Sequence, residues 1–239
     1  MRIIILLWAF IQLLFSLPQE VIITHNTNNP PFKFVNENNE PDGILIDIWK
    51  LWSQKTGIKV KFFPAAFEDS LRYIQNGNAD IHAGLFHTAK RQEEFLFSKP
   101  LMPLKYYYFF DKSIQPTFNT QELGSYVIGT PKGFTTTFVQ ENFPNVFVKE
   151  YKNFPDVYAD FINGYLKVFV SPAENLKYFL SYYDLENNAY YDVNRPLYVK
   201  EYFGALKIGN EALLEIVNKG LEQITQEEID AIKTSWFDR

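Results

Sequence analysis

The sequence lacks cysteine altogether and has only three histidines among its 239 residues. Without cysteine the protein can form no disulfide, no cysteine-bound metal site and no lipid-bearing N-terminal cysteine. The three histidines are scattered along the chain, which argues against a histidine-based metal site. We therefore expect a protein without a metal or another cofactor.

An excess of positive charge is also missing. The formal net charge is -5, and no cluster of lysine and arginine is interleaved with aromatic residues. Nucleic-acid binding requires a basic face, so this composition excludes nucleic acid as a partner.

Apolar and aromatic residues are abundant instead. Hydrophobic residues make up 46% of the chain, aromatic residues 18% and charged residues 21%. These proportions are typical of a folded globular protein, and the length fits one large domain or two lobes. Most of the aromatic side chains are expected in the core, although aromatics also line ligand clefts.

The first sixteen residues predict export. Met1 and Arg2 give a short positive start, residues 3–15 are apolar apart from Gln12, and Ser16 is a small residue at a possible cleavage point. This pattern is typical of a secretory signal peptide, and the apolar run is short for a spanning helix. The alternative is an uncleaved membrane anchor.

Strand and helix patterns alternate in two blocks. Expected strands cover 21–24, 58–63, 79–85, 126–129, 146–150 and 167–170, and expected helices cover 44–56, 68–76, 135–143 and 155–163. Gly57 and Gly77 are expected to end the first two helices. Strand–helix–strand units at this spacing predict two α/β lobes with mostly parallel sheets. Further strands are expected at 106–110 and 205–208, and residues 212–237 are expected to be helical and to return to the first lobe.

Residues 80–100 carry the most informative motifs. A buried-strand pattern ending in Ala83-Gly84 leads to Thr88-Ala89-Lys90-Arg91 and then to an apolar turn ending in Phe97-Ser98-Lys99-Pro100. Supporting elements are Pro30-Pro31-Phe32-Lys33-Phe34, Gly43-Ile44-Leu45-Ile46-Asp47 and Gly77-Asn78-Ala79-Asp80. In this order the chain resembles the solute-binding proteins of family 3, which are two-lobed periplasmic proteins that bind amino acids and similar polar molecules.

The resemblance implies an architecture and a role. It implies the type II periplasmic binding protein fold, with lobe 1 at 17–106 and 204–239, lobe 2 at 107–203, and two hinge crossings. A small carboxylate-bearing solute would be captured between the lobes and passed to an ABC-type transporter or reported to a membrane sensor. Residues 221–237 are most similar to versions fused to sensor kinases and diguanylate cyclases, but the sequence carries no such module. We expect a stand-alone periplasmic monomer that is not a lipoprotein.

In the first lobe the resemblance makes Arg91 the carboxylate ligand, since a guanidinium can hold a carboxylate through two hydrogen bonds. The alternative is a surface pair with Glu93 or Glu94. Ala83 and Gly84 would offer backbone groups, with glycine permitting close approach.

Four further positions of the first lobe have two interpretations each. Thr88 contacts the solute or only caps a helix. Phe67 covers the solute or packs in the core. Asn26 and Asn29 follow the first strand, at the sheet edge where α/β proteins bind ligands, or they only form a turn.

In the second lobe, Gly133 and Thr135 belong to a loop that runs into a helix. Backbone N–H groups at a helix start can bind an anionic group. The alternative is that Thr135 only caps the helix.

The chain departs from the amino-acid-binding pattern at several positions. Phe86 stands where the family often has a hydroxyl residue, and Lys167 replaces a usual aspartate. Ser171 and Pro172 align with the carboxylate that holds a ligand ammonium, and Glu174 is the nearest acid. An unpaired ammonium would be costly in a buried site, so a carboxylate ligand is expected and a standard amino acid is in doubt.

Two other functions stay open. Cyclohexadienyl dehydratases use the same fold, and Glu174 with His87 could serve as their acid–base groups. Phe86 and Pro172 also fit a degenerate module that binds a protein partner. Binding without catalysis is the favoured interpretation.

Overall fold

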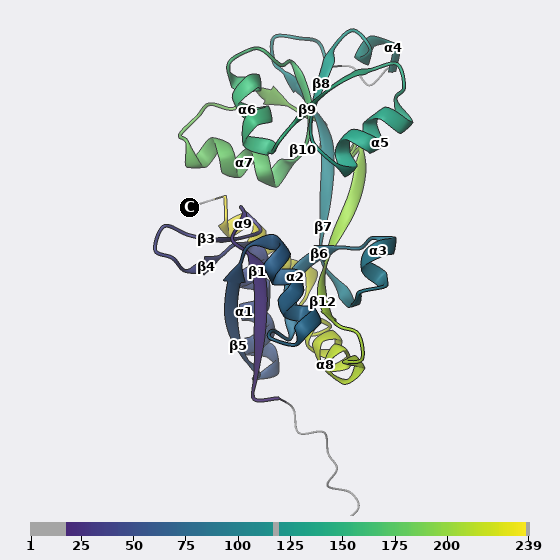
Figure 1. Ribbon diagram of the computed structural model, residues 1–239. Helices are drawn as coiled ribbons and strands as arrows, with labels where there is room; N and C mark the ends of the chain where they lie inside the picture. Colours follow the sequence, from purple (N-terminus) through teal and green to yellow (C-terminus); the bar gives the residue numbers. More distant parts are fainter. Residues whose placement is uncertain (1–17, 117–119, 238–239) are drawn as a thin grey trace, which may run out of the picture. The chain divides into compact units, whose positions relative to one another are not determined.

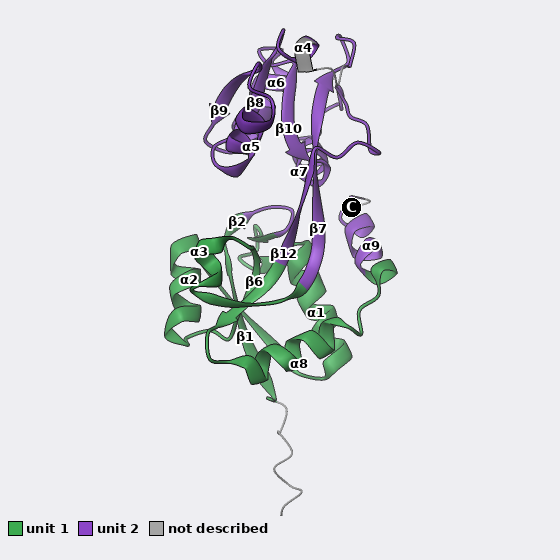
Figure 2. Ribbon diagram, turned by 90° about the vertical axis from the view of Figure 1, so that its right-hand side faces the viewer, with its two compact units in different colours: residues 1–28, 33–99, 203–228 green, residues 29–32, 100–202, 229–239 purple. Residues whose placement is uncertain are grey.

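The computed structural model describes residues 18–116 and 120–237, which divide into two compact units coloured separately in Figure 2. Unit 1 contains residues 1–28, 33–99 and 203–228, and unit 2 contains residues 29–32, 100–202 and 229–239. The predicted signal peptide lies outside the described residues. Within the described ranges no helix has both the length and the apolar character needed to cross a bilayer.

Unit 1 is an α/β unit whose elements are labelled in Figure 1. Its strands are β1 (Glu20–Asn26), β3 (Lys33–Val35), β4 (Pro41–Asp42), β5 (Lys59–Ala65) and β6 (Ile81–Phe86). Its helices are α1 (Ile44–Thr56), α2 (Phe67–Asn76), α3 (Ala89–Gln92) and α8 (Glu211–Leu221). Strand β1 pairs in parallel with β5 and β6, as the strand–helix alternation predicts. A small sheet of order β2-β3-β4, with β2 at Asn28–Asn29, adjoins these strands.

The first two helices end where their glycines predict. Gly57 and Gly77 take left-handed backbone conformations with φ of 73° and 75°, and their N–H groups return to carbonyls of the last helical turn. Apolar positions of α1 that repeat on one face are buried, Trp49 and Trp52 among them. Trp52 Nε1 donates to the carbonyl of Val217 at 3.1 Å, which ties α1 to α8.

Unit 2 repeats the α/β pattern. Its elements are α4 (Thr120–Leu123), β8 (Val127–Pro131), α5 (Phe134–Asn142), β9 (Phe147–Tyr151), α6 (Phe154–Ile162), β10 (Val168–Pro172), α7 (Ala173–Tyr182) and β11 (Ala189–Tyr190). Strand β8 pairs in parallel with β9 and β10. Its core is rich in aromatic rings: Phe169 stacks on Phe109 at 5.0 Å between centroids and meets Phe161 edge-on at 4.8 Å.

Two long strands pass from one unit to the other. Strand β7 (Phe95–Asp111) leaves unit 1 after Lys99, and β12 (Tyr198–Lys207) leaves unit 2 after Tyr202. In the sheet order β12 follows β6, and β7 lies between β12 and β10. Strands β7 and β10 run antiparallel. The α/β fold with two units is therefore confirmed. The expected lobe boundaries stay a prediction, and the described residues from Ile229 onward belong to unit 2 by their contacts.

Three segments differ from the sequence-based expectation. Residues 95–100, expected as a turn, begin the seventeen-residue strand β7, because Pro100 and Pro103 interrupt the pattern without ending the strand. Helix α7 was not expected; Pro172 is its N-cap, a position that needs no backbone donor. The helical region 212–237 is two helices, α8 and α9 (Gln226–Ser235), separated by a capping box in which Thr225 and Glu228 bond each other's N–H groups.

Candidate solute-binding site

The site begins at the carboxyl end of β6 in unit 1. Residues 81–85 of this strand are buried, and after Phe86 the chain turns outward into the single-turn helix α3. Thr88 Oγ1 accepts a hydrogen bond from the N–H of Arg91 at 3.2 Å. Thr88 therefore does cap this helix, and the cap fixes Arg91 relative to the strand end.

Arg91 is half-buried and held on two sides within unit 1. Its Nη1 donates to the carbonyl of Phe86 at 2.9 Å, and its guanidinium lies over the ring of Phe67, 5.6 Å from the centroid. Burial lowers the pKa of Arg91 from 12.5, while Glu68 and Glu94 act in the opposite direction. A guanidinium stays charged across the physiological range in any case.

The surface-pair interpretation of Arg91 is not what the structure shows. Among the described residues no carboxylate lies within 4.0 Å of its guanidinium, and Glu94 accepts instead from Gln75 Nε2 at 3.3 Å. The side chain is thus positioned by a carbonyl and a ring, which leave its charge uncompensated by a direct ion pair.

A buried histidine connects the strand end to α2. The N–H of Gly84 donates to His82 Nδ1 at 3.2 Å, so the proton of the neutral ring is on Nε2, which faces Ser70 Oγ at 3.2 Å. Ser70 Oγ in turn donates to the carbonyl of Phe67 at 2.6 Å. Burial is the main reason that the pKa of His82 is well below 6.5, and the charges of Lys33 and Arg91 add to it. This chain of bonds sets the position of Phe67 relative to Gly84.

Lys33 extends from β3 to the same strand end. It is 2% exposed, and its Nζ donates to the carbonyl of Gly84. Burial, followed by the charge of Arg91, lowers the pKa of Lys33 to about 7. The neighbouring carbonyl of Ala83 accepts from Trp49 Nε1 at 2.8 Å. The two backbone carbonyls expected to serve a solute are thus both bonded within unit 1.

His25 completes what we call the basic cluster: His25, Lys33, His82 and Arg91. The N–H at His25 Nδ1 donates to the carbonyl of Asn26 at 3.1 Å, and burial lowers the pKa of His25 to about 4. Asn26 Oδ1 is enclosed without a hydrogen-bond partner in the described chain. Asn29 belongs to unit 2, where its Nδ2 donates to Tyr202 Oη at 3.2 Å.

The unit 2 candidates lie on two elements. Gly133, with φ of 114°, is the N-cap of α5, so Thr135 is not the cap. Thr135 is buried and its Oγ1 bonds Tyr198 Oη at 2.7 Å. Tyr198 stacks on Tyr106 with ring centroids 4.4 Å apart, and the exposed ring of Phe134 meets Tyr198 edge-on. The Nζ of Lys200 lies over the ring of Phe134, 3.3 Å from its centroid, so this region combines aromatic rings with a cation.

Ser171 and Glu174 are both engaged inside unit 2. Ser171 is fully buried, and its hydroxyl bonds the Tyr158 hydroxyl and the Pro172 carbonyl. Glu174 forms an ion pair with Lys233 at 2.8 Å, and only 12% of its side chain is exposed. The acid nearest to the expected ammonium position is therefore already neutralised by a lysine.

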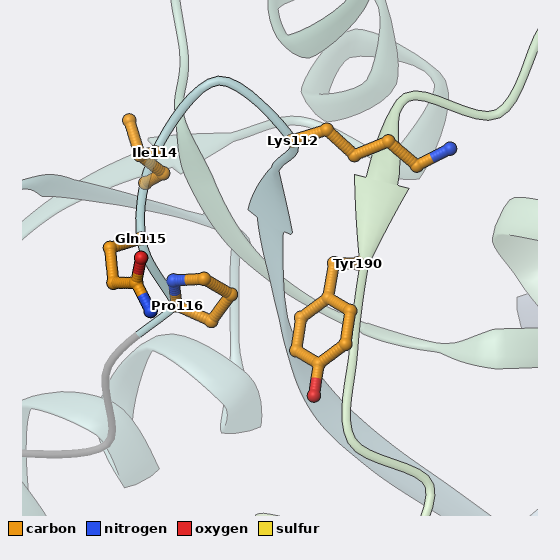
Figure 3. A pocket seen from close by; sticks show the side chains of 5 residues that line it. All are labelled: Lys112, Ile114, Gln115, Pro116 and Tyr190. Atoms are coloured by element: carbon orange, nitrogen blue, oxygen red, sulfur yellow. The ribbon is translucent and has the colours of Figure 1, made fainter.

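His87 is not a member of the basic cluster. His87 is exposed, bonds Gln92 at 2.8 Å and packs on Phe97 with ring centroids 4.7 Å apart. A pocket of about 480 Å³ in unit 2 is lined by Lys112, Ile114, Gln115, Pro116 and Tyr190 (Figure 3). None of the site residues expected from sequence lines it.

Sequence reasoning did not single out Lys33 or His82. Lys33 stands between two phenylalanines in an alternating segment, where a lysine ordinarily faces solvent, and His82 was counted among scattered histidines. Their positions in the sequence could have indicated them, because Lys33 lies inside the Pro30–Phe34 element and His82 directly precedes Ala83-Gly84.

The strand order, the two passing strands and the two α/β units define a two-lobed periplasmic binding protein. The family model of the bacterial extracellular solute-binding proteins, family 3, matches residues 21–239, and the chain belongs to that family. The ABC transporter arginine-binding protein 1 of Escherichia coli is 24% identical over 212 residues, covering 87% of this chain and 86% of the relative.

Solved structures show the same fold. The periplasmic VFT2 domain of Bordetella pertussis BvgS has a TM-score of 0.75 at 18% identity, over 91% of this chain and 93% of that domain. The ancestral amino acid-binding protein AncCDT-1, a precursor of cyclohexadienyl dehydratase, has a TM-score of 0.68 at 20% identity, over 92% of this chain and 95% of that one.

Proposed function

We propose that this protein is a non-catalytic receptor for a small carboxylate-bearing solute, which it delivers to an ABC-type transporter or reports to a membrane sensor. The proposal rests on the position of Arg91 and on its lack of a direct ion pair. It is fixed by Phe86 and Phe67 at the end of β6, and no carboxylate of the described chain pairs with it. A solute carboxylate would supply the missing counter-charge through two parallel hydrogen bonds.

Membership of family 3 supports a solute as the ligand, and one named relative is the arginine-binding protein of an ABC transporter. We keep the periplasm as the site of action, reached by the predicted signal peptide, and a monomer as the working form. Of the unit 2 candidates, Gly133 stays a predicted residue of the solute site. We do not include Ser171 in the proposed solute site, because its hydroxyl is hydrogen-bonded to the Tyr158 hydroxyl and the Pro172 carbonyl.

The enzyme alternative receives less support from the contacts than the receptor. A general acid must present its proton to a substrate, and Glu174 is instead paired with Lys233. His87 is hydrogen-bonded to Gln92 on the surface of unit 1. The test for catalysis is product formation from prephenate or arogenate, and turnover of either would replace the receptor proposal.

A thermal-shift screen tests the proposal directly. Residues 17–239 are screened against amino acids, polyamines, dicarboxylates and aromatic acids. A ligand that binds only the folded form should add about 2.7 kcal/mol at a hundred times its Kd. For a chain of this size that raises the melting temperature by roughly 5–10 °C.

Arg91→Ala decides whether a hit uses the proposed site. We expect this variant to lose the shift for every carboxylate. Arg72→Ala is the matched control, because Arg72 is largely exposed on α2 and pairs with Asp69. Unchanged affinity of Arg91→Ala in calorimetry would remove Arg91 from the site. No shift with any compound would favour a module that recognises a protein partner.

A further inference from the structure

Two cations of the protein bond the same short stretch of strand. Lys33 donates to the carbonyl of Gly84, and Arg91 donates to the carbonyl of Phe86 at 2.9 Å. Gly84 and Phe86 are two residues apart on β6, which is about 7 Å along a strand. The ammonium of Lys33 is therefore part of the surroundings in which a carboxylate on Arg91 would lie.

An α-amino acid brings its own ammonium to these surroundings. Its ammonium and its carboxylate are attached to the same carbon atom, so a carboxylate on Arg91 places the ammonium within a few bond lengths. A desolvated ammonium needs hydrogen-bond acceptors or a negative charge, and lacking them costs several kcal/mol. Selectivity for or against an amino acid therefore depends on the hydrogen-bond acceptors near Arg91.

The nearby acceptors are already in use. The carbonyl of Gly84 accepts from Lys33, that of Ala83 accepts from Trp49, and that of Phe86 accepts from Arg91. A carbonyl has a second lone pair, but a second ammonium at Gly84 would lie beside that of Lys33. Like charges at such a distance in a poorly solvated site repel strongly.

Other oxygens of unit 1 do not provide an acceptor for a ligand ammonium at the end of β6. Asn26 Oδ1 at the end of β1 is unbonded, but it is enclosed and does not reach the surface. Glu68 and Glu94 act on Arg91 over a distance, without a direct ion pair. Among the described residues of unit 1, the end of β6 thus holds two cations, the half-buried Arg91 and the 2% exposed Lys33, and the carbonyls of Ala83, Gly84 and Phe86 already accept hydrogen bonds.

We propose that Lys33 supplies from within the protein the ammonium group that an amino acid would bring, so that the unit 1 site selects carboxylic acids without an α-ammonium group. This inference rests on the proposed carboxylate site at Arg91 and names its ligand class. The lowered pKa of Lys33, about 7, agrees with it, because a bound carboxylate would favour the protonated lysine. Binding should therefore take up protons near neutral pH.

Matched ligand pairs test the inference by isothermal titration calorimetry. The pairs are 3-phenylpropanoate with phenylalanine, succinate with aspartate, and glutarate with glutamate. The wild-type protein is expected to bind the unsubstituted acid of at least one pair roughly tenfold or more tightly than its 2-amino partner, since an unpaired ammonium costs more than 1.4 kcal/mol. Titrations in buffers of different ionisation enthalpy measure the expected proton uptake.

Lys33→Met removes the internal ammonium and keeps most of the side-chain volume. In this variant the preference for the unsubstituted acid should shrink to near parity or reverse, and proton uptake should disappear. Lys61→Met is the control, because Lys61 is an exposed lysine on β5 of the same unit. It should bind as the wild type does.

The inference is overturned if the wild type binds an amino acid as tightly as its unsubstituted partner, with loss of both in Arg91→Ala. It is also overturned if Lys33→Met keeps the wild-type preference. If Lys33→Met does not fold, the wild-type preference and its proton uptake still decide. Binding of no carboxylate by the wild type or by Lys33→Met would instead refute the proposed function, and the inference would fall with it.

Discussion

The two units hold their candidate residues by different chemistry. In unit 1 a buried basic cluster surrounds one strand end, and all three histidines of the chain lie in this unit. In unit 2 the corresponding positions are aromatic or already paired: Tyr198 stacks on Tyr106, and Glu174 is bonded to Lys233. Among the described residues, Arg91 of unit 1 therefore has no direct ion pair, whereas the unit 2 candidate Glu174 is paired with Lys233.

Two core clusters of the units differ in aromatic content, while Trp49 and Trp52 are buried elsewhere in unit 1. The unit 2 core is built around Tyr107, Phe109, Tyr158, Phe161 and Phe169, and one core cluster of unit 1 consists of Ile74, Ala79, Leu85, Phe95 and Ala205. Aromatic pairs add specific geometry to apolar burial, whereas aliphatic side chains contribute mainly through area. The difference predicts which substitutions and which conditions disturb each unit.

Phe169→Ala should have the largest effect of those proposed. Phe169 is fully buried and contacts three aromatic rings, so its removal leaves a cavity that rigid rings fill poorly. We expect a loss of about 3–5 kcal/mol in the free energy of unfolding, measured by urea denaturation followed by circular dichroism. Tyr165→Ala, at an 81% exposed position of the same unit, should change stability by less than about 0.5 kcal/mol. Equal effects of both variants would contradict the described core.

Arg91→Lys tests the difference in available charge. Lysine keeps the positive charge but cannot form two parallel bonds to a carboxylate, so affinity for an identified carboxylate should fall roughly ten- to a hundredfold. Glu174→Gln in unit 2 should leave that affinity within experimental error, because the carboxylate of Glu174 already faces Lys233. Isothermal titration calorimetry on both variants compares their affinities for the carboxylate. A large loss in Glu174→Gln would mean that unit 2 contributes charge to the ligand after all.

The features that local sequence encodes were predicted well. Apolar periodicity and Gly57 define α1, and the Thr88–Arg91 motif locates the carboxylate candidate. The environment of those residues was not predictable, because it depends on partners distant in sequence. Lys33 bonds Gly84, 51 residues later, and Lys233 neutralises Glu174 from another helix. Nothing in the residues around Lys33 or Glu174 indicates such partners, so their roles became visible only in the folded chain.

Acid should destabilise unit 1 through its buried histidines. Burial lowers the pKa of His25 to about 4 from 6.5, so between these values the unfolded chain binds a proton that the folded chain does not. This contribution is fully present above pH 6.5 and is lost as the pH falls toward 4. For His25 alone the loss from pH 7 to 4.5 is about 2 kcal/mol, and His82 acts in the same direction.

Tryptophan fluorescence can follow this loss, since Trp49 and Trp52 are buried in unit 1; the buried Trp236 of unit 2 contributes to the same signal. Urea denaturation at several pH values gives the stability at each pH. His87→Gln is the control, because His87 is an exposed histidine of the same unit. A wild-type stability that stays constant from pH 7 to 4.5 would show that His25 and His82 are not buried as neutral groups.

Alkali should act on unit 1 in the opposite sense to acid, through Lys33. Its pKa of about 7 in the folded chain is below the ordinary 10.5, so between these values the unfolded chain binds the extra proton and stability rises with pH. From pH 7 to 9 the gain is about 2 kcal/mol. Lys33→Met should abolish this rise of stability with pH. The variant also loses the hydrogen bond to Gly84, but that change in stability is the same at every pH and leaves the slope unaffected. The slope of stability against pH, compared between wild type, Lys33→Met and Lys61→Met, therefore isolates the titration of Lys33. An identical slope in all three proteins would place the charge of Lys33 in solvent and remove it from the basic cluster.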